Sequence, residues 1–343
     1  MMGGLRLRRH VPDATGRTVR GDAMTSHAAP PDGGAAAVEH AAVFGGSGAG
    51  LCAPVLPRIA AGAEGGRRVT VAVGDRLREA LREALRARLP EPLLRRVRFA
   101  DRAEYYDAPG RTVGALHRLA VEAGGAGALF VGEPAPPSGT RLERDQWRRM
   151  EAAVHRALAG DRLAVLCLHD TSALDPAALR GALEAHPLLL AQGGVRPNPS
   201  HRTAEEAAGA AAPPVPPPAD PVLTMDIRPD LPSVREEAVG LAEAAGLPQG
   251  RRSDLLVAVN ELAANVLEHG AGKGTVTLWR EGGRLVCEVL DGSAALDDPL
   301  VGFRPADGLG GRGYGLWITR QVCDFLEVLP GPDGTRMRAH FRI

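Results

Sequence analysis

The chain has 343 residues, with 41 basic and 41 acidic side chains, so its formal net charge at pH 7 is zero. This length is enough for two domains that each bury a core, and the balanced charge gives no general attraction to nucleic acid. No apolar run approaches the roughly 20 residues of a membrane helix, and no apolar core follows Arg8 and Arg9 as in a signal peptide. We therefore expect a cytoplasmic protein that binds neither nucleic acid nor membrane directly.

The cysteines are Cys52, Cys167, Cys287 and Cys323. They form no CxxC pair, and three of them stand in apolar surroundings. This pattern favours reduced, buried thiols over a disulfide framework or a zinc site.

Residues 1–38 mix Gly, Ala, Pro, Arg and Asp without periodicity, which predicts a disordered tail, and Met24 offers a second start of translation. Residues 39–200 alternate strand-like and helix-like segments, which predicts an α/β domain with a mostly parallel sheet. The expected strands are 69–73, 97–99, 128–131 and 163–168, and the expected helices are 76–88, 116–123, 147–158 and 176–185.

The glycine-rich segment 45–50 resembles a phosphate loop only superficially. It lacks the following Lys-Ser/Thr pair, and we expect no strand before it, so a flexible loop is the favoured interpretation. Residues 201–221 are rich in alanine and proline. Proline at this density cannot continue a helix, and the segment reads as a semi-rigid linker.

Residues 222–343 predict a second domain of the α+β sandwich type, with an antiparallel sheet on one side and helices on the other. Its expected strands are 222–227, 275–280, 285–290, 325–329 and 336–343, and its expected helices are 231–245, 252–269 and 314–323. A stretch rich in Gly, Pro and Asp, residues 291–311, separates the strands 275–280 and 285–290 from the last helix.

Three short sequence motifs, which we call boxes, carry candidate functional residues. The first box, residues 261–270, lies mainly on the expected helix 252–269. Glu261, Asn265 and His269 recur at i, i+4 and i+8 and so share one stripe of the helix. An asparagine oxygen suits Mg²⁺, and Glu261, one turn earlier, could orient or deprotonate an incoming hydroxyl. The alternative is an ordinary amphipathic helix with three exposed polar residues.

The second and third boxes supply groups for a purine and for phosphate. Asp291 ends a strand, where its carboxylate could accept a hydrogen bond from the adenine amine, and Gly292 would let the purine approach the backbone. Taken alone, this pair reads as an Asp-Gly turn. Gly311, Gly313 and Gly315 precede a helix, whose backbone amides could close on phosphate.

Together, and in this order, the boxes resemble the ATP site of the GHKL superfamily, whose fold is the Bergerat α+β sandwich. Residues 231–340 resemble its anti-sigma-factor serine/threonine kinase branch, also through residues 256–262, 287–289, 298–300, 315–317, 322–324 and 334–335. The resemblance implies Glu261 as catalytic base, Asn265 as the ligand of Mg²⁺ and residues 294–310 as a short ATP lid. It implies ATP contacts at Asn265, Asp291, Gly292, Gly311, Gly313, Gly315, Leu316 and Thr335. Tyr314 departs from the small or aliphatic residues often seen between the last two glycines.

The same resemblance implies partners. The kinase would phosphorylate a serine or threonine of a STAS-type anti-sigma-factor antagonist, would sequester a sigma factor, and would form a homodimer. One alternative is a non-catalytic ATP-responsive protein-binding module. Another is a histidine-kinase-like protein, which would need a helical hairpin with a phospho-acceptor histidine where the linker lies; His201 there has no apolar heptads around it.

Residues 39–188 resemble the MEDS (DcmR-type) sensory domain through His40, Glu151, His186-Pro187, and the segments 69–73, 97–101, 132–134 and 166–170. We name His40, Glu133, Glu151 and His169 as a candidate sensory pocket. His40, Cys167 and His169 could also be imagined as metal ligands. Their spacing fits no standard zinc pattern, so the sequence favours buried structural roles for them.

Overall fold

The computed structural model describes residues 38–46, 48–134, 139–208, 216–219, 221, 223–227, 231–293, 296, 298, 300–304 and 314–343. All of the expected tail except Val38 lies outside the described residues, as do most of the expected lid and residues 209–215 of the linker. Two residues of the third box, Gly311 and Gly313, also lie outside them.

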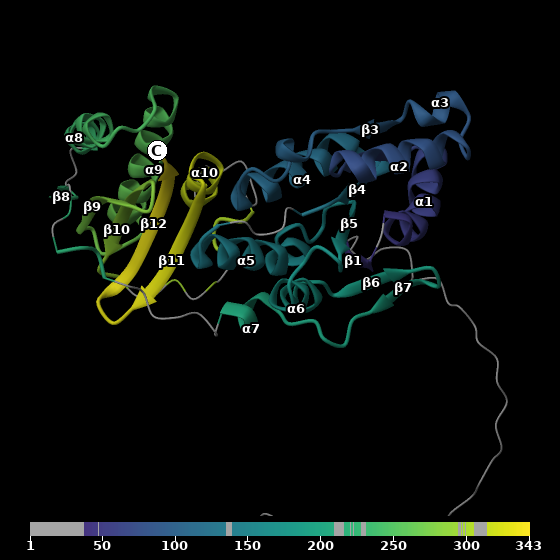
Figure 1. Cartoon of the computed structure of the whole chain (residues 1–343). Coiled ribbons are helices and arrows are strands. Elements are labelled where there is room, and N and C mark those ends of the chain that lie inside the picture. Colours follow the sequence, from purple (N-terminus) through teal and green to yellow (C-terminus); the bar gives the residue numbers. More distant parts are fainter. Residues whose placement is uncertain are drawn as a thin grey trace, which may run out of the picture. The chain divides into compact units, whose positions relative to one another are not determined.

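The N-terminal part of the described chain forms a seven-stranded sheet (Figure 1). Its strands are β1 (Glu39–Gly45), β2 (Arg68–Ala72), β3 (Val97–Phe99), β4 (Ala128–Gly132), β5 (Leu163–Asp170), β6 (Leu188–Ala191) and β7 (Gly194–Pro197). The strand order is β3-β2-β4-β5-β1-β6-β7, and only the β6–β7 pair is antiparallel. The predicted mostly parallel α/β domain is confirmed.

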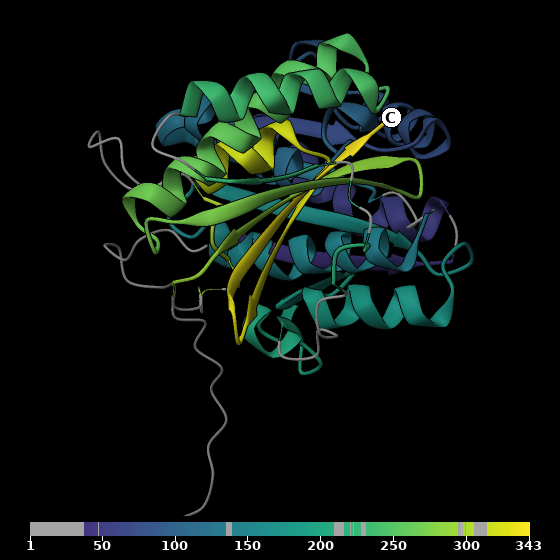
Figure 2. The ribbon, with the colours of Figure 1, turned by 90° about the vertical axis from the view of Figure 1, so that its left-hand side faces the viewer.

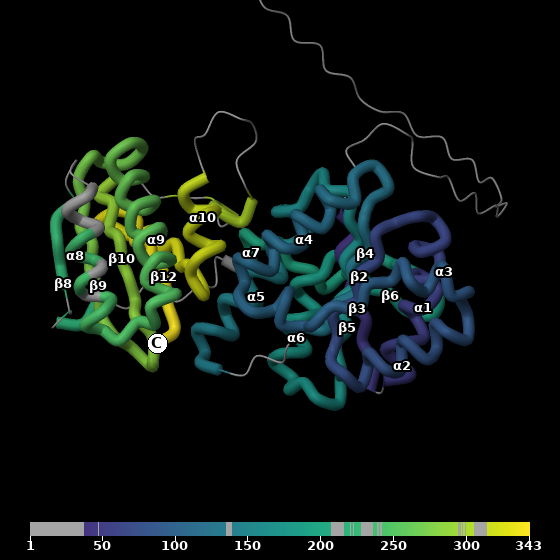
Figure 3. Tube along the Cα trace, turned by 90° about the horizontal axis from the view of Figure 1, so that it is seen from above, coloured from purple at the N-terminus to yellow at the C-terminus, as the bar shows by residue number. Residues whose placement is uncertain are grey.

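Helices cover both faces of this sheet (Figure 3). They are α1 (Gly48–Glu64), α2 (Asp75–Arg86), α3 (Glu91–Leu94), α4 (Pro109–Ala123), α5 (Arg141–Ala157) and α6 (Pro176–Ala185), with 3-10 turns at Arg102–Glu104 and Gly124–Ala126. Because side chains alternate along a strand, β5 divides between two cores. Leu166 and Leu168 pack with α1 and α2, whereas Val165 and Cys167 pack with α4 and α5.

The expectation of a flexible loop at residues 45–50 was wrong. Strand β1 precedes this segment, and α1 already begins at Gly48. The strand escaped prediction because its sequence, EHAAVFG, carries two alanines at its centre and few residues that favour strands. Gly45 is needed at the turn from strand to helix, since a methyl group there would lie 3.0 Å from the backbone nitrogen of Leu51.

The expected linker is also not extended throughout. Its first part contains the short helix α7 (Ala204–Ala208). The amide of Thr203 donates to the carboxylate of Glu206 at 2.7 Å, and the amide of Glu206 donates back to the Thr203 hydroxyl at 3.2 Å. This reciprocal capping explains why a helix forms before the prolines.

The C-terminal part forms a five-stranded sheet in which every pair is antiparallel. Its strands are β8 (Leu223–Asp226), β9 (Gly274–Glu281), β10 (Arg284–Asp291), β11 (Phe325–Gly331) and β12 (Gly334–Arg342), in the order β11-β12-β10-β9-β8. The helices α8 (Leu231–Ala244), α9 (Gln249–Glu268) and α10 (Gly315–Val322) pack with the sheet around one apolar core (Figure 2). This is the predicted α+β sandwich.

Within the compact unit Ala35–Ile343, helix α4 approaches helix α10 closely. A methyl group on Gly110 would lie 2.2 Å from the carbonyl oxygen of Arg320, and one on Gly114 would lie 2.2 Å from the side-chain oxygen of Gln321. The Gln321 amide donates to the Gly110 carbonyl at 3.0 Å. These two glycines, four residues apart, therefore allow the contact between the helices. No helix among the described residues is long and apolar enough to cross a membrane.

Candidate functional site

Helix α9 places the first box beside the third. Its residues Leu262 and Val266 are fully buried in the core, while Glu261 and Asn265 are half-buried on another face. A methyl group on Gly315 would lie 2.8 Å from Asn265 Nδ2 and 2.9 Å from its Oδ1. The amide that was predicted to bind Mg²⁺ therefore lies directly against the last glycine of the third box.

The second box meets the other end of the first. Asp291 ends β10 and is 8% exposed. Its Oδ1 accepts hydrogen bonds from the backbone amides of Ala271 at 3.0 Å and Ser293 at 2.9 Å. A methyl group on Gly270 would lie 2.1 Å from Oδ2, which takes neither of these bonds. The carboxylate is thus fixed by the backbone through one oxygen, and a second oxygen remains beside Gly270.

Strand β12 holds Thr335 opposite Asp291. The two residues are paired in the sheet, and Thr335 is 1% exposed. Its hydroxyl accepts a hydrogen bond from the amide of Leu296 at 3.2 Å, which ties the start of the expected lid to the sheet. Gly334 has φ +118°, and a methyl group there would lie 2.0 Å from the carbonyl oxygen of Asp291.

Residues 300–304, which are the longest described part of the expected lid, pack on α10. A methyl group on Gly302 would lie 2.7 Å from Leu316 Cβ. Arg320 donates from Nε to the carbonyl of Val301 at 3.0 Å, and its guanidinium lies 3.9 Å from the ring centroid of Phe303. Burial lowers the pKa of Arg320 to about 10, so the side chain stays charged at neutral pH.

The C-terminal site therefore brings together most of what the sequence singled out. The amide of Asn265 lies against the N-terminus of α10, and the fixed carboxylate of Asp291 lies against Gly270, whose backbone amide donates to the Asn265 carbonyl at 3.0 Å; Glu261 lies one turn before Asn265 on α9. Such groups can hold a divalent cation, an exocyclic amine and phosphate oxygens. Gly292 follows Asp291 and leaves open space, since the nearest atom to a methyl group there is Ala271 Cβ at 3.9 Å.

Among the N-terminal candidates, Glu133 accepts a hydrogen bond from the amide of Gly74 at 2.7 Å, and its charge acts on the Tyr106 hydroxyl together with those of Cys167 and Glu151. Glu151 and His169 line a cavity of about 210 Å³ together with Trp147 and others.

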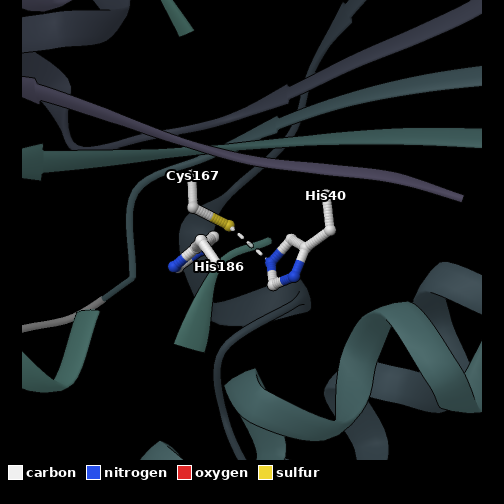
Figure 4. Close-up of side chains that lie close together, drawn as sticks. All are labelled: His40, Cys167 and His186. Carbon is white, nitrogen blue, oxygen red and sulfur yellow. Dashed lines mark hydrogen bonds between the residues drawn. The ribbon is translucent and has the colours of Figure 1, made fainter. Parts of the chain in front are cut away.

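His40 lies instead beside two residues outside the predicted pocket, Cys167 and His186 (Figure 4). The His40 and His186 ring centroids are 4.2 Å apart, and those of His169 and His186 are 5.1 Å apart. Sequence reasoning left His186 out of the pocket because its place beside His40 depends on the parallel pairing of β1 with β6, which spacing does not reveal.

Burial disfavours the charged form of each side chain in this group. It lowers the pKa values of His40 and His169 well below the ordinary value and lowers that of His186 to about 4. It raises the pKa of the Cys167 thiol well above the ordinary value and that of Glu151 to about 7. The histidines therefore present neutral imidazoles at neutral pH, with a free lone pair on one ring nitrogen each.

Comparison with protein families identifies a sensory domain and an ATPase domain, as in a signalling protein. Residues 39–187 match the family model of the MEDS domain, the methanogen/methylotroph, DcmR sensory domain. Residues 224–341 match the model of the histidine kinase-like ATPase domain. The chain therefore carries an N-terminal MEDS domain and a C-terminal histidine kinase-like ATPase domain. No curated protein matched the chain.

Proposed function

We propose that the C-terminal domain binds ATP with Mg²⁺ and transfers the γ-phosphoryl group to a serine or threonine of a STAS-type anti-sigma-factor antagonist. The same domain would sequester a sigma factor, and the MEDS domain would control both. The observation that carries the proposal is that α9 and the residues just after it contact both other boxes, through Asn265 against Gly315 and through Gly270 and Ala271 against Asp291.

Each group has a defined part in this proposal. Asn265 would hold Mg²⁺, which bridges phosphate oxygens and neutralises the developing charge. Asp291 would accept a hydrogen bond from the adenine amine through Oδ2, supported by Gly292 and Thr335. Glu261 would accept the proton of the attacking hydroxyl. Gly315 and Leu316 begin α10, and their backbone amides would bind the phosphates; in the proposal Gly311 and Gly313 would contribute further phosphate contacts.

A second candidate function is that of a non-catalytic ATP-responsive binding module. The half-buried carboxylate of Glu261 one turn from Asn265 favours the kinase, because nucleotide binding alone does not require a base there.

The residues between β7 and β8 disfavour phosphoryl transfer to a histidine of this chain. The described part of this region contains one helix of five residues, α7, which is too short for a dimerisation hairpin. The ring of His201 packs against that of His155 at 5.0 Å, and its Nε2 is buried without a hydrogen-bond partner among the described residues.

Control by the MEDS domain has a physical route in the contact between α4 and α10. Gly110 and Gly114 hold α4 against the C-terminal half of α10, and α10 begins at Gly315, beside Asn265. A ligand that shifts α4 would therefore act on the helix that presents its N-terminus to phosphate. Such coupling requires that the ligand bind the two arrangements with different affinity.

Phosphoryl transfer to purified STAS-type proteins, with γ-labelled ATP and the full chain, tests the proposal. We expect an acid-stable phosphoester, since phosphohistidine is acid-labile. The Glu261→Gln variant should bind MgATP normally and lose transfer by about a hundredfold or more. Glu268→Gln, an exposed residue of the same helix, is the control and should behave as wild type. Phosphoryl transfer that survives Glu261→Gln would show that Glu261 is not the base. If the protein binds MgATP but phosphorylates no STAS-type protein, the non-catalytic binding module becomes the favoured function.

A further inference from the structure

Strand geometry gathers three potential metal ligands on one face of the parallel sheet. Strands β1 and β5 run parallel, with Ala42 opposite Cys167. Because side chains on a strand alternate, His40, Cys167 and His169 all point to the face that is covered by α4 and α5. His186 follows α6 and Glu151 lies on α5, and both reach the same place.

Distances in this cluster fit a tetrahedral metal ion. The atoms available for coordination on His40, Cys167 and His186 lie within 4.8 Å of one another, and Cys167 Sγ is 3.6 Å from His40 Nε2 (Figure 4). Zinc–sulfur and zinc–nitrogen bonds of about 2.3 and 2.0 Å, at the tetrahedral angle, place the two ligand atoms about 3.5 Å apart. The observed separation therefore matches one edge of a zinc coordination tetrahedron.

His186 is held in the state that a metal ligand needs. Its Nδ1 lies 2.6 Å from the carbonyl oxygen of Ala182, which can only accept a hydrogen bond, so Nδ1 carries the proton. Nε2 is then an unprotonated acceptor, and it is buried without a hydrogen-bond partner among the described residues. Metal-binding histidines are commonly oriented by such a backbone carbonyl.

One more buried ring nitrogen near the ion position has no hydrogen-bond partner within the described part of the chain. It is His169 Nε2, on a side chain that is 4% exposed. Buried polar atoms normally find a partner, so this nitrogen and His186 Nε2 together indicate that a partner binds there.

A second set of ligands shares His186 and opens to a cavity. Glu151, His169 and His186 also offer atoms within 4.8 Å of one another. Glu151 and His169 line the cavity of about 210 Å³ that Pro134 and Trp147 border. The cavity gives an ion a route to His186 and gives a small ligand a place beside the ion.

We propose that His40, Cys167 and His186 bind one divalent transition-metal ion of the zinc class, with the fourth coordination position on the side of Glu151 and His169. A thiolate and two imidazoles form a donor set that zinc prefers and that calcium or magnesium does not. On binding, the Cys167 thiol releases its proton to solvent, and the ion compensates the charge of the thiolate. The metal centre would then be part of what the MEDS domain senses.

Cobalt(II) is a suitable probe, because a bound thiolate gives a charge-transfer band and tetrahedral coordination gives intense visible bands. The full chain is stripped with a chelator under reducing conditions and titrated with Co²⁺ without nucleotide, then with Zn²⁺. We expect saturation at one equivalent of Co²⁺ per chain, both kinds of band, and displacement by Zn²⁺.

Variants assign the ligands. Cys167→Ser should abolish the charge-transfer band and weaken Zn²⁺ binding at least tenfold. Cys52→Ser is the matched control, because Cys52 is a buried free thiol that packs on the other face of the same sheet, and it should leave both signals unchanged. If Cys167→Ser does not fold, as judged by circular dichroism, His40→Gln is used and should lower Zn²⁺ affinity equally.

The results separate this proposal from a merely structural cluster. No stoichiometric Co²⁺ binding by wild type, or a charge-transfer band that survives Cys167→Ser, would overturn it and would leave a hydrogen bond between the Cys167 thiol and His40. The titration reads a site on the N-terminal sheet without nucleotide, so its outcome does not depend on the proposed kinase activity.

Discussion

Gly315→Ala is the sharpest perturbation of the nucleotide site. The backbone of Gly315 does not have a positive φ, so alanine is compatible with its conformation, and in a helix alanine is favoured over glycine by up to about 1 kcal/mol. The obstacle is the side chain of Asn265, since the added methyl group would lie 2.8 Å from Nδ2 and 2.9 Å from Oδ1. Ordinary contact needs about 3.5–4.0 Å, so the amide must move by about 1 Å.

Such a shift removes the amide from the geometry that Mg²⁺ demands. A misplacement of about 1 Å can reduce function about a hundredfold, so we expect MgATP affinity to fall about 10- to 100-fold, or about 1.4–2.8 kcal/mol. The melting temperature should stay the same or rise slightly. Gly240→Ala is the control, because a methyl group there meets no atom within 4 Å. Unchanged MgATP affinity in Gly315→Ala, with calorimetry as the assay, would refute the placement of Asn265 at the metal.

Two further predictions concern the contact between the domains and the buried thiols. The leucine of Gly114→Leu should collide with Gln321, loosen α10 and weaken MgATP binding severalfold. Val121→Leu, at an exposed position on α4, should leave MgATP binding unchanged. Equal MgATP affinities in the two variants would argue against control through α4. Burial raises the pKa values of Cys287 and Cys323 from 9.0 to about 12. The unfolded chain therefore loses these protons first, and stability falls between pH 9 and 12, by about 1.4 kcal/mol for each thiol at pH 10. Denaturant unfolding at pH 8 and pH 10 measures this loss, which Cys→Ala variants should reduce; an equal loss in those variants would contradict the assignment.

The candidate nucleotide-site residues could be named from the sequence because each carries a local signal, and their role in binding ATP stays a prediction. Glu261 and Asn265 share a helix face by spacing alone, and Asp291 and Gly315 stand where a strand ends and a helix begins. What the sequence could not supply was the close approach of Asn265 to Gly315, which depends on how α9 and α10 pack.

The metal cluster was less predictable for a physical reason. His40, Cys167 and His186 are distant in sequence, and the pairing of β1 with both β5 and β6 brings them together. Strand β1 itself gave little signal, because alanines occupy its centre. The hydrogen bond that Glu133 accepts from the amide of Gly74 was likewise not predictable, since it joins residues 59 positions apart.

The most direct test of the account is calorimetric titration of the full chain with MgATP. We expect wild type to bind, and Asn265→Ala and Asp291→Ala each to lose at least tenfold in affinity. Asp333→Asn, an exposed residue of the β11–β12 hairpin, should bind as wild type does. Loss in both site variants but not in the control would support a nucleotide site built from the three boxes. Wild-type protein that binds no MgATP, or binding that both site variants retain, would contradict it.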